Sequence, residues 1–168
     1  MGAKEFVYLV GENDEVLGYK SRDELTDDDT WRIIAVNIYD ESGEYILVQQ
    51  RSKLKKLNPG LWTLAVVGTV EKDDTYESCA IREVKEEIGV DCIDLVEVTK
   101  IYYKATLGHR FCSIFSDIIP KDTTITIQED EVDIAKWIHI DELKIWVENK
   151  PEEFTKYTIE IWKYLGVL

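Results

Sequence analysis

The feature that most limits the fold of this chain is one segment in which the spacing of the apolar residues changes. Between Tyr76 and Ile88 the apolar side chains recur every three or four residues, as on one face of an α-helix. These residues are Ala80, Ile81, Val84 and Ile88. Gly89 follows, at a place where helices commonly end on a left-handed residue. The segment predicts an amphipathic helix that covers a neighbouring layer.

The rest of the sequence reads mostly as strands, in short runs rich in β-branched and aromatic residues. We expect one hairpin at residues 5–10 and 16–19, and a second at 31–39 and 45–50, whose turn contains Ser42-Gly43. Further strands are expected at 61–70, as one or two strands, and at 93–103, 111–118 and 132–138, with helices at 141–148 and 151–165. Strands with interspersed helices predict an α/β layered fold class.

Length and charge narrow the classes of function. The 168 residues predict a single domain spanning 1–168, and 34 acidic against 20 basic residues give a net charge of −14. Nucleic acid is therefore a poor partner, because binding it requires many contacts from Lys and Arg to phosphates. The three cysteines form no CxxC pair, and no stretch resembles a signal peptide or a membrane span, so we expect free thiols and a cytoplasmic location. A homodimer is compatible with the sequence.

Three acidic residues stand together on the expected helix. Glu83, Glu86 and Glu87 have the spacing i, i+3 and i+4, which places their carboxylates on one side. Like charges at these spacings destabilise a helix by roughly 0.2–0.5 kcal/mol per pair. A solvated acidic face is the plainer interpretation of such a cluster. Mg²⁺ would reverse the penalty, because it binds through a few carboxylates and the phosphate oxygens of a substrate.

The surrounding stretch, GTVEKDDTYESCAIREVKEEIGV, resembles the box that defines the Nudix family, G-x5-E-x7-R-E-U-x-E-E-x-G-U. The matching residues are Gly68, Arg82, Glu83, Val84, Glu86, Glu87, Gly89 and Val90. The resemblance implies a Nudix fold, with a mixed sheet sandwiched between helices. It also implies a hydrolase of small diphosphate compounds that uses Mg²⁺, with Mn²⁺ as an alternative, and whose metal is held by Gly68 and the box glutamates.

At two positions of the box, physical chemistry explains the residue type without reference to the family. Gly68 lets the backbone approach a metal or phosphate closely, or adopt a positive φ. Arg82 can fork onto a carboxylate and orient one of the glutamates. One position departs from the pattern, because Asp74 stands where the family has Glu. Its side chain is shorter by one methylene, so we expect the usual interaction to need a water or to be lost.

A second acidic patch precedes the strand expected at 132–138. Nudix proteins often carry a metal-binding or catalytic glutamate at this place, and Glu131 is the candidate here, as a metal ligand or as the base that activates water. Glu129 is the alternative, since alternation along a strand would point both side chains to the same side. A solvated loop is the plain reading of either residue.

A basic loop, RSKLKK at residues 51–56, interrupts the acidic sequence. Together with the following NPGLW, it resembles the isopentenyl-diphosphate isomerase-like branch of the Nudix superfamily. In that branch the matching positions hold a diphosphate, and this role is carried over to Arg51 and Lys55. A mobile basic loop is the alternative interpretation.

The resemblance leaves three functions open. A hydrolase would use Glu86, Glu87, Glu131 and Arg82 in catalysis. An isomerase would need a Cys shortly after the Trp of PGxW and histidines among its metal ligands. Here residues 64–67 are Leu, Ala, Val and Val, and only two histidines are present, which favours the hydrolase. A catalytically weak module that senses a nucleotide is the third function.

Overall fold

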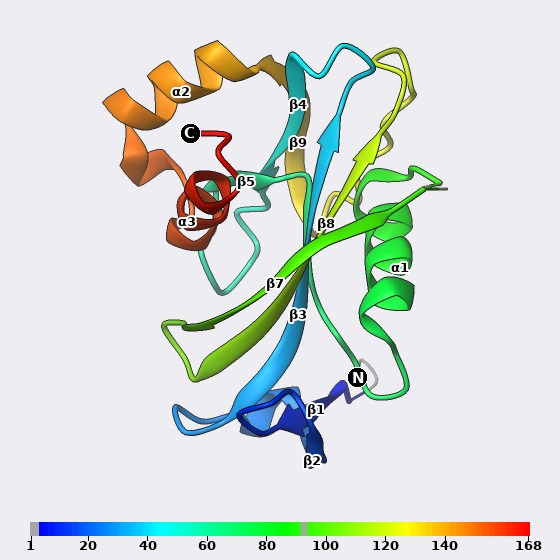
Figure 1. The fold of residues 1–168 in the computed structure, drawn as a ribbon, viewed down its shortest axis with the longest axis vertical. Helices are drawn as coiled ribbons and strands as arrows, with labels where there is room; N and C mark the ends of the chain where they lie inside the picture. Colours follow the sequence, from blue (N-terminus) through cyan, green and yellow to red (C-terminus); the bar gives the residue numbers. More distant parts are fainter. Residues whose placement is uncertain (1–3, 92–93) are drawn as a thin grey trace.

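The computed structural model describes residues 4–91 and 94–168, so Cys92 and the start of the strand expected at 93–103 lie outside it. Its strands are β1 (Phe6–Val10), β2 (Val16–Ser21), β3 (Thr30–Tyr39), β4 (Tyr45–Arg51), β5 (Trp62–Leu64), β6 (Val66–Thr69), β7 (Val96–Lys104), β8 (His109–Ile118) and β9 (Val132–His139). Its helices are α1 (Tyr76–Ile88), α2 (Ile140–Asn149) and α3 (Lys156–Tyr164), with 3-10 turns at Arg22–Glu24 and Pro151–Glu153. The sheet lies between α1 on one side and α2 with α3 on the other (Figure 1).

The long strand β3 organises a mixed sheet. It runs parallel to β8 along its whole length and antiparallel to β1, β4 and β6. The expected hairpin of residues 31–39 and 45–50 forms only at its turn, where Tyr39 pairs with Ile46. Beyond that pair the strands separate, because β6 pairs with β3 while β5 and β9 pair with β4. The apolar run at 61–70 therefore forms two strands that bridge the fork between β3 and β4.

Two apolar cores lie on opposite faces of the sheet, as the alternation of side chains along β3 requires. Ile34, Val36 and Ile38 pack in the core that also contains Val84 and Ile88 of α1. The alternate residues of β3 pack in the core under α2 and α3. Alternate residues of β4 also face the two cores: Ile46 and Val48 lie under α2 and α3, and Leu47 lies under α1. The same alternation decides which polar side chains of β4 face α1.

The helix α1 has the predicted bounds and ends. Thr75 and Ser78 form a reciprocal capping box at its start, and Gly89 ends it with a φ of 69°. The inward face differs from the prediction, because Ile81 is exposed whereas Cys79 and Glu87 are buried. Cys79 and Cys112 are free thiols, as expected.

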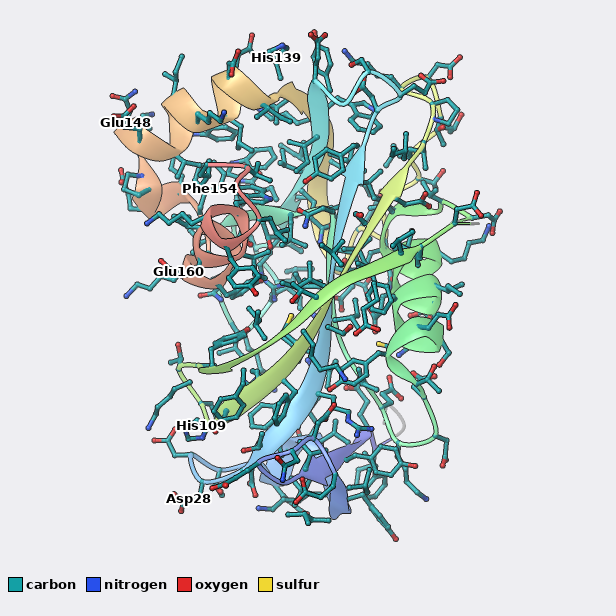
Figure 2. The ribbon with its side chains drawn as sticks, viewed as in Figure 1. Asp28, His109, His139, Glu148, Phe154 and Glu160 are labelled. Atoms are coloured by element: carbon teal, nitrogen blue, oxygen red, sulfur yellow. The ribbon has the colours of Figure 1, made fainter. Side chains whose placement is uncertain are left out.

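The helix expected at 151–165 is wrong as a single element, because the chain is extended at Phe154 and Thr155. The Thr155 N–H donates to the Trp62 carbonyl at 2.9 Å, which replaces a helical bond with a contact to β5. The Phe154 side chain is buried between the rings of Trp146 and Trp162, where α2 and α3 meet (Figure 2). Tertiary packing thus divides the segment into a 3-10 turn and α3.

Candidate functional site

Glu87 is the innermost carboxylate of α1. It is only 6% exposed, and its Oε2 accepts a hydrogen bond from Gln49 Nε2 of β4 at 2.9 Å. The pKa of Glu87 is raised to about 8, chiefly by burial; Gln49 and Arg51 oppose the shift, and nearby Glu83 and Glu131 add to it. Glu87 thus lies within electrostatic reach of groups from α1, from β4 and from the turn before β9.

Glu83 lies one turn earlier on the same face and is also largely buried. Burial raises the pKa of Glu83 to about 7; Arg82 lowers it and Glu86 raises it. Its side chain packs directly against the backbone of Gly68 in β6. The φ of Gly68 is not positive, so backbone conformation does not require a glycine here. The close approach of the Glu83 side chain does, because it leaves no room for a Cβ.

We expect Gly68→Ala to displace Glu83. The new Cβ would lie 2.6 Å from Glu83 Cδ, so the carboxylate has to swing away. Glu83 is a flexible side chain, and we expect little change in melting temperature. Displacing a group that supports a metal typically lowers affinity by about 10–100-fold, and a Mn²⁺ titration measures this.

Gly18→Ala is the matched control, because its Cβ would meet nothing within 4 Å. Equal Mn²⁺ affinity of both alanine variants and the unmodified protein would contradict a role for the Gly68 approach in cation binding.

Arg82 is the centre of a carboxylate cluster at the outer side of α1. Its guanidinium donates to Asp74 Oδ2 at 2.9 Å, to Glu83 Oε1 at 2.9 Å and to Glu86 Oε2 at 3.1 Å. The shorter side chain of Asp74 still reaches the Arg82 guanidinium directly, as an ion pair. The side chain of Glu86 is 51% exposed, so Glu86 faces solvent while Glu87 faces the core.

Glu131 is brought to the same region by two backbone contacts. The Gln128 N–H donates to the Glu87 carbonyl at 3.0 Å, and the Ser52 N–H donates to the Glu131 carbonyl at 2.9 Å. The Glu131 carboxylate forms an ion pair with Lys55 of the basic loop. Glu131 is therefore held between α1 and the loop that follows β4.

Glu129 and Glu131 do not lie on a strand, so the prediction that alternation points both to the same side is wrong. Residues 128–131 form a turn, in which both the Glu131 and the Val132 N–H groups donate to the Gln128 carbonyl, and β9 begins only at Val132. Strand alternation does not apply there, and Glu129 is exposed.

Both residues assigned to phosphate binding border this region. Arg51 is the last residue of β4; its Nε donates to the Leu57 carbonyl at 3.2 Å, and its charge acts on the Glu87 carboxyl. Lys55 reaches the region through Glu131. The fold thus brings together residues that are up to 80 positions apart in the sequence.

The chemistry of this group suits a hard cation. Within residues 4–91 and 94–168, no three Asp, Glu, His or Cys side chains already converge as a ligand set. Instead, Arg82 supplies the positive charge to Glu83 and Glu86. Among the described residues Glu87 forms no ion pair, although the Arg51 charge acts on it from a distance, and the buried oxygen Gln49 Oε1 beside it accepts no hydrogen bond there. Buried oxygen ligands that form no ion pair fit Mg²⁺ or Mn²⁺.

A family model described as the NUDIX domain matches residues 29–158, which is more than half of the chain. The chain belongs to the Nudix family. The resemblance stated from the box residues is confirmed.

Curated relatives of this Nudix protein carry two kinds of name. An isopentenyl-diphosphate Delta-isomerase of Roseobacter denitrificans is 32% identical over 130 residues, which are 73% of this chain and 73% of that protein. An uncharacterized Nudix hydrolase of Pseudomonas aeruginosa is 30% identical over 135 residues, covering 80% of this chain and 78% of that protein. The similarity to the isomerase-like branch is thereby confirmed.

Solved structures show the same fold. A crystal structure of a Deinococcus radiodurans protein has a TM-score of 0.73 at 23% identity, covering 86% of this chain and 90% of that chain. The dihydroneopterin triphosphate pyrophosphohydrolase of E. coli has a TM-score of 0.55 at 25% identity, covering 66% and 82%. The expected mixed sheet between helices is confirmed as a Nudix fold.

Sequence reasoning missed Gln49 as part of this Nudix site. Its signal was present, because alternation along residues 45–51 places Gln49 and Arg51 on one face of β4. A glutamine on a face that otherwise carries apolar residues such as Leu47 needs a polar partner. Its partner, Glu87, is 38 residues away, and no local pattern identifies it.

Proposed function

We propose that this Nudix protein is a Mg²⁺-dependent hydrolase that cleaves the diphosphate bond of a small nucleoside or other organic diphosphate. The observation that carries the proposal is the position of Glu87, which contacts Gln49 and lies within electrostatic reach of Arg51 and Glu131. Carboxylates suited to bind a metal and a cationic side chain suited to bind phosphate thus lie close together. Mn²⁺ is the alternative metal.

In this proposal, Glu83, Glu86 and Glu87 hold the metal together with the Gly68 region and Glu131. Magnesium, when bound, neutralises charge on the phosphates and lowers the pKa of water. Glu131 or Glu87 takes a proton from the water that attacks phosphorus. The new P–O bond forms as the bond to the bridging oxygen breaks, so that two phosphate-bearing products leave. Arg82 orients Glu83 and Glu86 through its hydrogen bonds.

Arg51 and Lys55 bind the substrate phosphates. Lys55 must exchange its ion pair with Glu131 for a phosphate, which frees Glu131 to act on the water. The basic loop therefore couples phosphate binding to the release of a carboxylate.

We expect Arg51→Ala to raise KM by roughly 10–100-fold, because a hydrogen bond between charged groups contributes about 1.5–3 kcal/mol. Steady-state kinetics on the preferred diphosphate measures this. Lys53→Ala is the control, since Lys53 is exposed on the same loop. Equal KM values for the Arg51 and Lys53 variants would remove Arg51 from the phosphate site.

The test of the proposed function is a screen of nucleoside, sugar, dinucleoside and isoprenoid diphosphates with and without Mg²⁺. Release of phosphate-bearing products that stops on adding EDTA supports the hydrolase. Tight binding of a nucleotide without any hydrolysis would instead indicate a sensing module.

The isomerase is the second candidate, because several curated relatives bear that name. The isomerase would need a cysteine shortly after Trp62, and this chain has the buried, unreactive residues Leu64, Ala65 and Val66 there. The histidines, His109 and His139, lie at opposite ends of the molecule (Figure 2), and neither is on α1. Incubation with isopentenyl diphosphate separates the candidates, because an isomer formed without release of phosphate would favour the isomerase.

Other expectations stay predictions: a single domain over 1–168, a homodimer, a small-molecule partner without nucleic acid, and a cytoplasmic location. In the part of the chain that the structure describes, no helix is long and apolar enough to cross a bilayer.

A further inference from the structure

Gln49 is a buried amide with one polar atom in use and one unused. The residue is 2% exposed. Its Nε2 donates to Glu87 Oε2 at 2.9 Å, and its Oε1 has no hydrogen-bond partner among the described residues. Buried polar atoms in folded proteins are nearly always paired with protein, ordered water or a ligand. The unused oxygen therefore indicates that a donor or a cation belongs beside it.

The surroundings of Gln49 decide which kind of group fits. The amide turns its N–H toward Glu87, and this orientation is the one that an ionised Glu87 beside a cation requires, because a carboxylate only accepts hydrogen bonds. This leaves Oε1 beside the buried Glu87 carboxylate, and Glu83 follows one helical turn away on α1. All three groups present oxygen, so a neutral donor would leave the negative charge unbalanced. Amide and carboxylate oxygens are the ligands that hard divalent cations prefer.

The adjacent residue shows that this arrangement is specific to position 49. Gln50 points to the other face of β4, where its Nε2 donates to the Gly60 carbonyl at 2.9 Å. Two neighbouring glutamines thus serve different faces of one strand, and only Gln49 faces the glutamates of α1.

We propose that Gln49 is a further residue of the cation site, with Nε2 holding Glu87 in place and Oε1 serving as an oxygen ligand of the ion. This assignment rests on the proposed function, because it presumes that α1 binds a divalent cation. It adds β4 as an element that contributes a metal ligand.

The experiment is a titration of the full chain with Mn²⁺, followed by the electron paramagnetic resonance signal of the free ion. Gln49→Met keeps the length of the side chain and removes both polar atoms, and we expect it to weaken Mn²⁺ binding by about 10–100-fold. Gln49→Glu keeps an oxygen and removes the N–H donor, and we expect it to bind Mn²⁺ at least as tightly as the unmodified protein. Gln50→Met is the matched control and should leave the affinity unchanged.

Each outcome decides a different point. Unchanged affinity in Gln49→Met overturns the assignment, and so does a loss in Gln49→Glu as large as that in Gln49→Met, since Gln49 would then act only by holding Glu87. If Gln49→Met does not fold, as judged by circular dichroism, the near-isosteric Gln49→Glu carries the test alone. Failure of the unmodified protein to bind Mn²⁺ would instead overturn the proposed function, and the assignment with it.

Discussion

Glu87→Gln is expected to lower kcat for Mg²⁺-dependent diphosphate hydrolysis by at least about 10²-fold, the effect typical of losing a general base. Glutamine has nearly the same shape but carries no negative charge, so it neither accepts a proton nor balances a cation. The site around it should persist, because Gln49 can still donate to the new amide oxygen at position 87. Steady-state kinetics at saturating Mg²⁺ measures the change, and circular dichroism checks the fold.

The control for this prediction lies on the same helix. Glu77 is exposed in the first turn of α1, away from Gln49, and Glu77→Gln should leave kcat within about twofold, because its charge affects only the helix end. Glu86→Gln should also abolish turnover if Glu86 binds metal, although its side chain faces solvent. Hydrolysis at the normal rate by Glu87→Gln would exclude Glu87 as ligand and as base.

Local signals in the sequence were sufficient to predict α1. Its apolar spacing and Gly89 both act within a few residues, and the helix has the predicted bounds. The fork between β3 and β4 could not be predicted in this way. The turn after Tyr39 looks like a hairpin, but long-range pairing of β3 with β8 and of β4 with β9 decides the path of each strand. The break at Phe154 has the same origin in contacts with β5.

In the candidate site, too, local sequence signals predicted some features, and others depend on long-range contacts. Helical spacing predicted that Glu83, Glu86 and Glu87 share one side of α1, whereas Glu87 faces the core and Glu86 faces solvent. That difference depends on how α1 packs on the sheet. The resemblance supplied Arg51 and Lys55, while the contact of Glu87 with Gln49 became visible only in three dimensions.

The burial of Glu87 predicts an unusual dependence of stability on pH in the absence of metal. Its pKa is raised from 4.5 to about 8 in the folded protein, chiefly by burial. Between these values the unfolded chain has released the proton and the folded chain retains it, so the free energy of unfolding falls as pH rises. Each pH unit costs about 1.4 kcal/mol for one such proton. The stability contributed by this group is complete below about pH 4.5 and is lost as pH approaches about 8.

Other carboxylates do not mask the effect. The pKa values of Asp14 and Asp29 are lowered, so their contribution is already complete above their ordinary value of 3.8 and stays constant across the window. Glu83, whose pKa is raised to about 7, acts in the same direction as Glu87. In urea unfolding with EDTA, Glu87 alone should therefore lower the free energy of unfolding by up to about 3 kcal/mol between about pH 5 and pH 7, and Glu83 should add to this loss.

A divalent cation should reverse this trend, because it binds the ionised carboxylates of the folded chain only. With Mg²⁺ present, the free energy of unfolding should be flat or should rise over the same pH window, since binding to the native state alone adds RT ln(1 + [Mg²⁺]/Kd). Glu87→Gln should lose the part of the pH dependence in EDTA that Glu87 contributes, leaving that of Glu83, and it should lose most of the gain from Mg²⁺. An equal slope in the unmodified protein and in Glu87→Gln would show that the buried carboxylate is not the titrating group. A slope that Mg²⁺ leaves unchanged would show that the carboxylates of α1 do not share a cation.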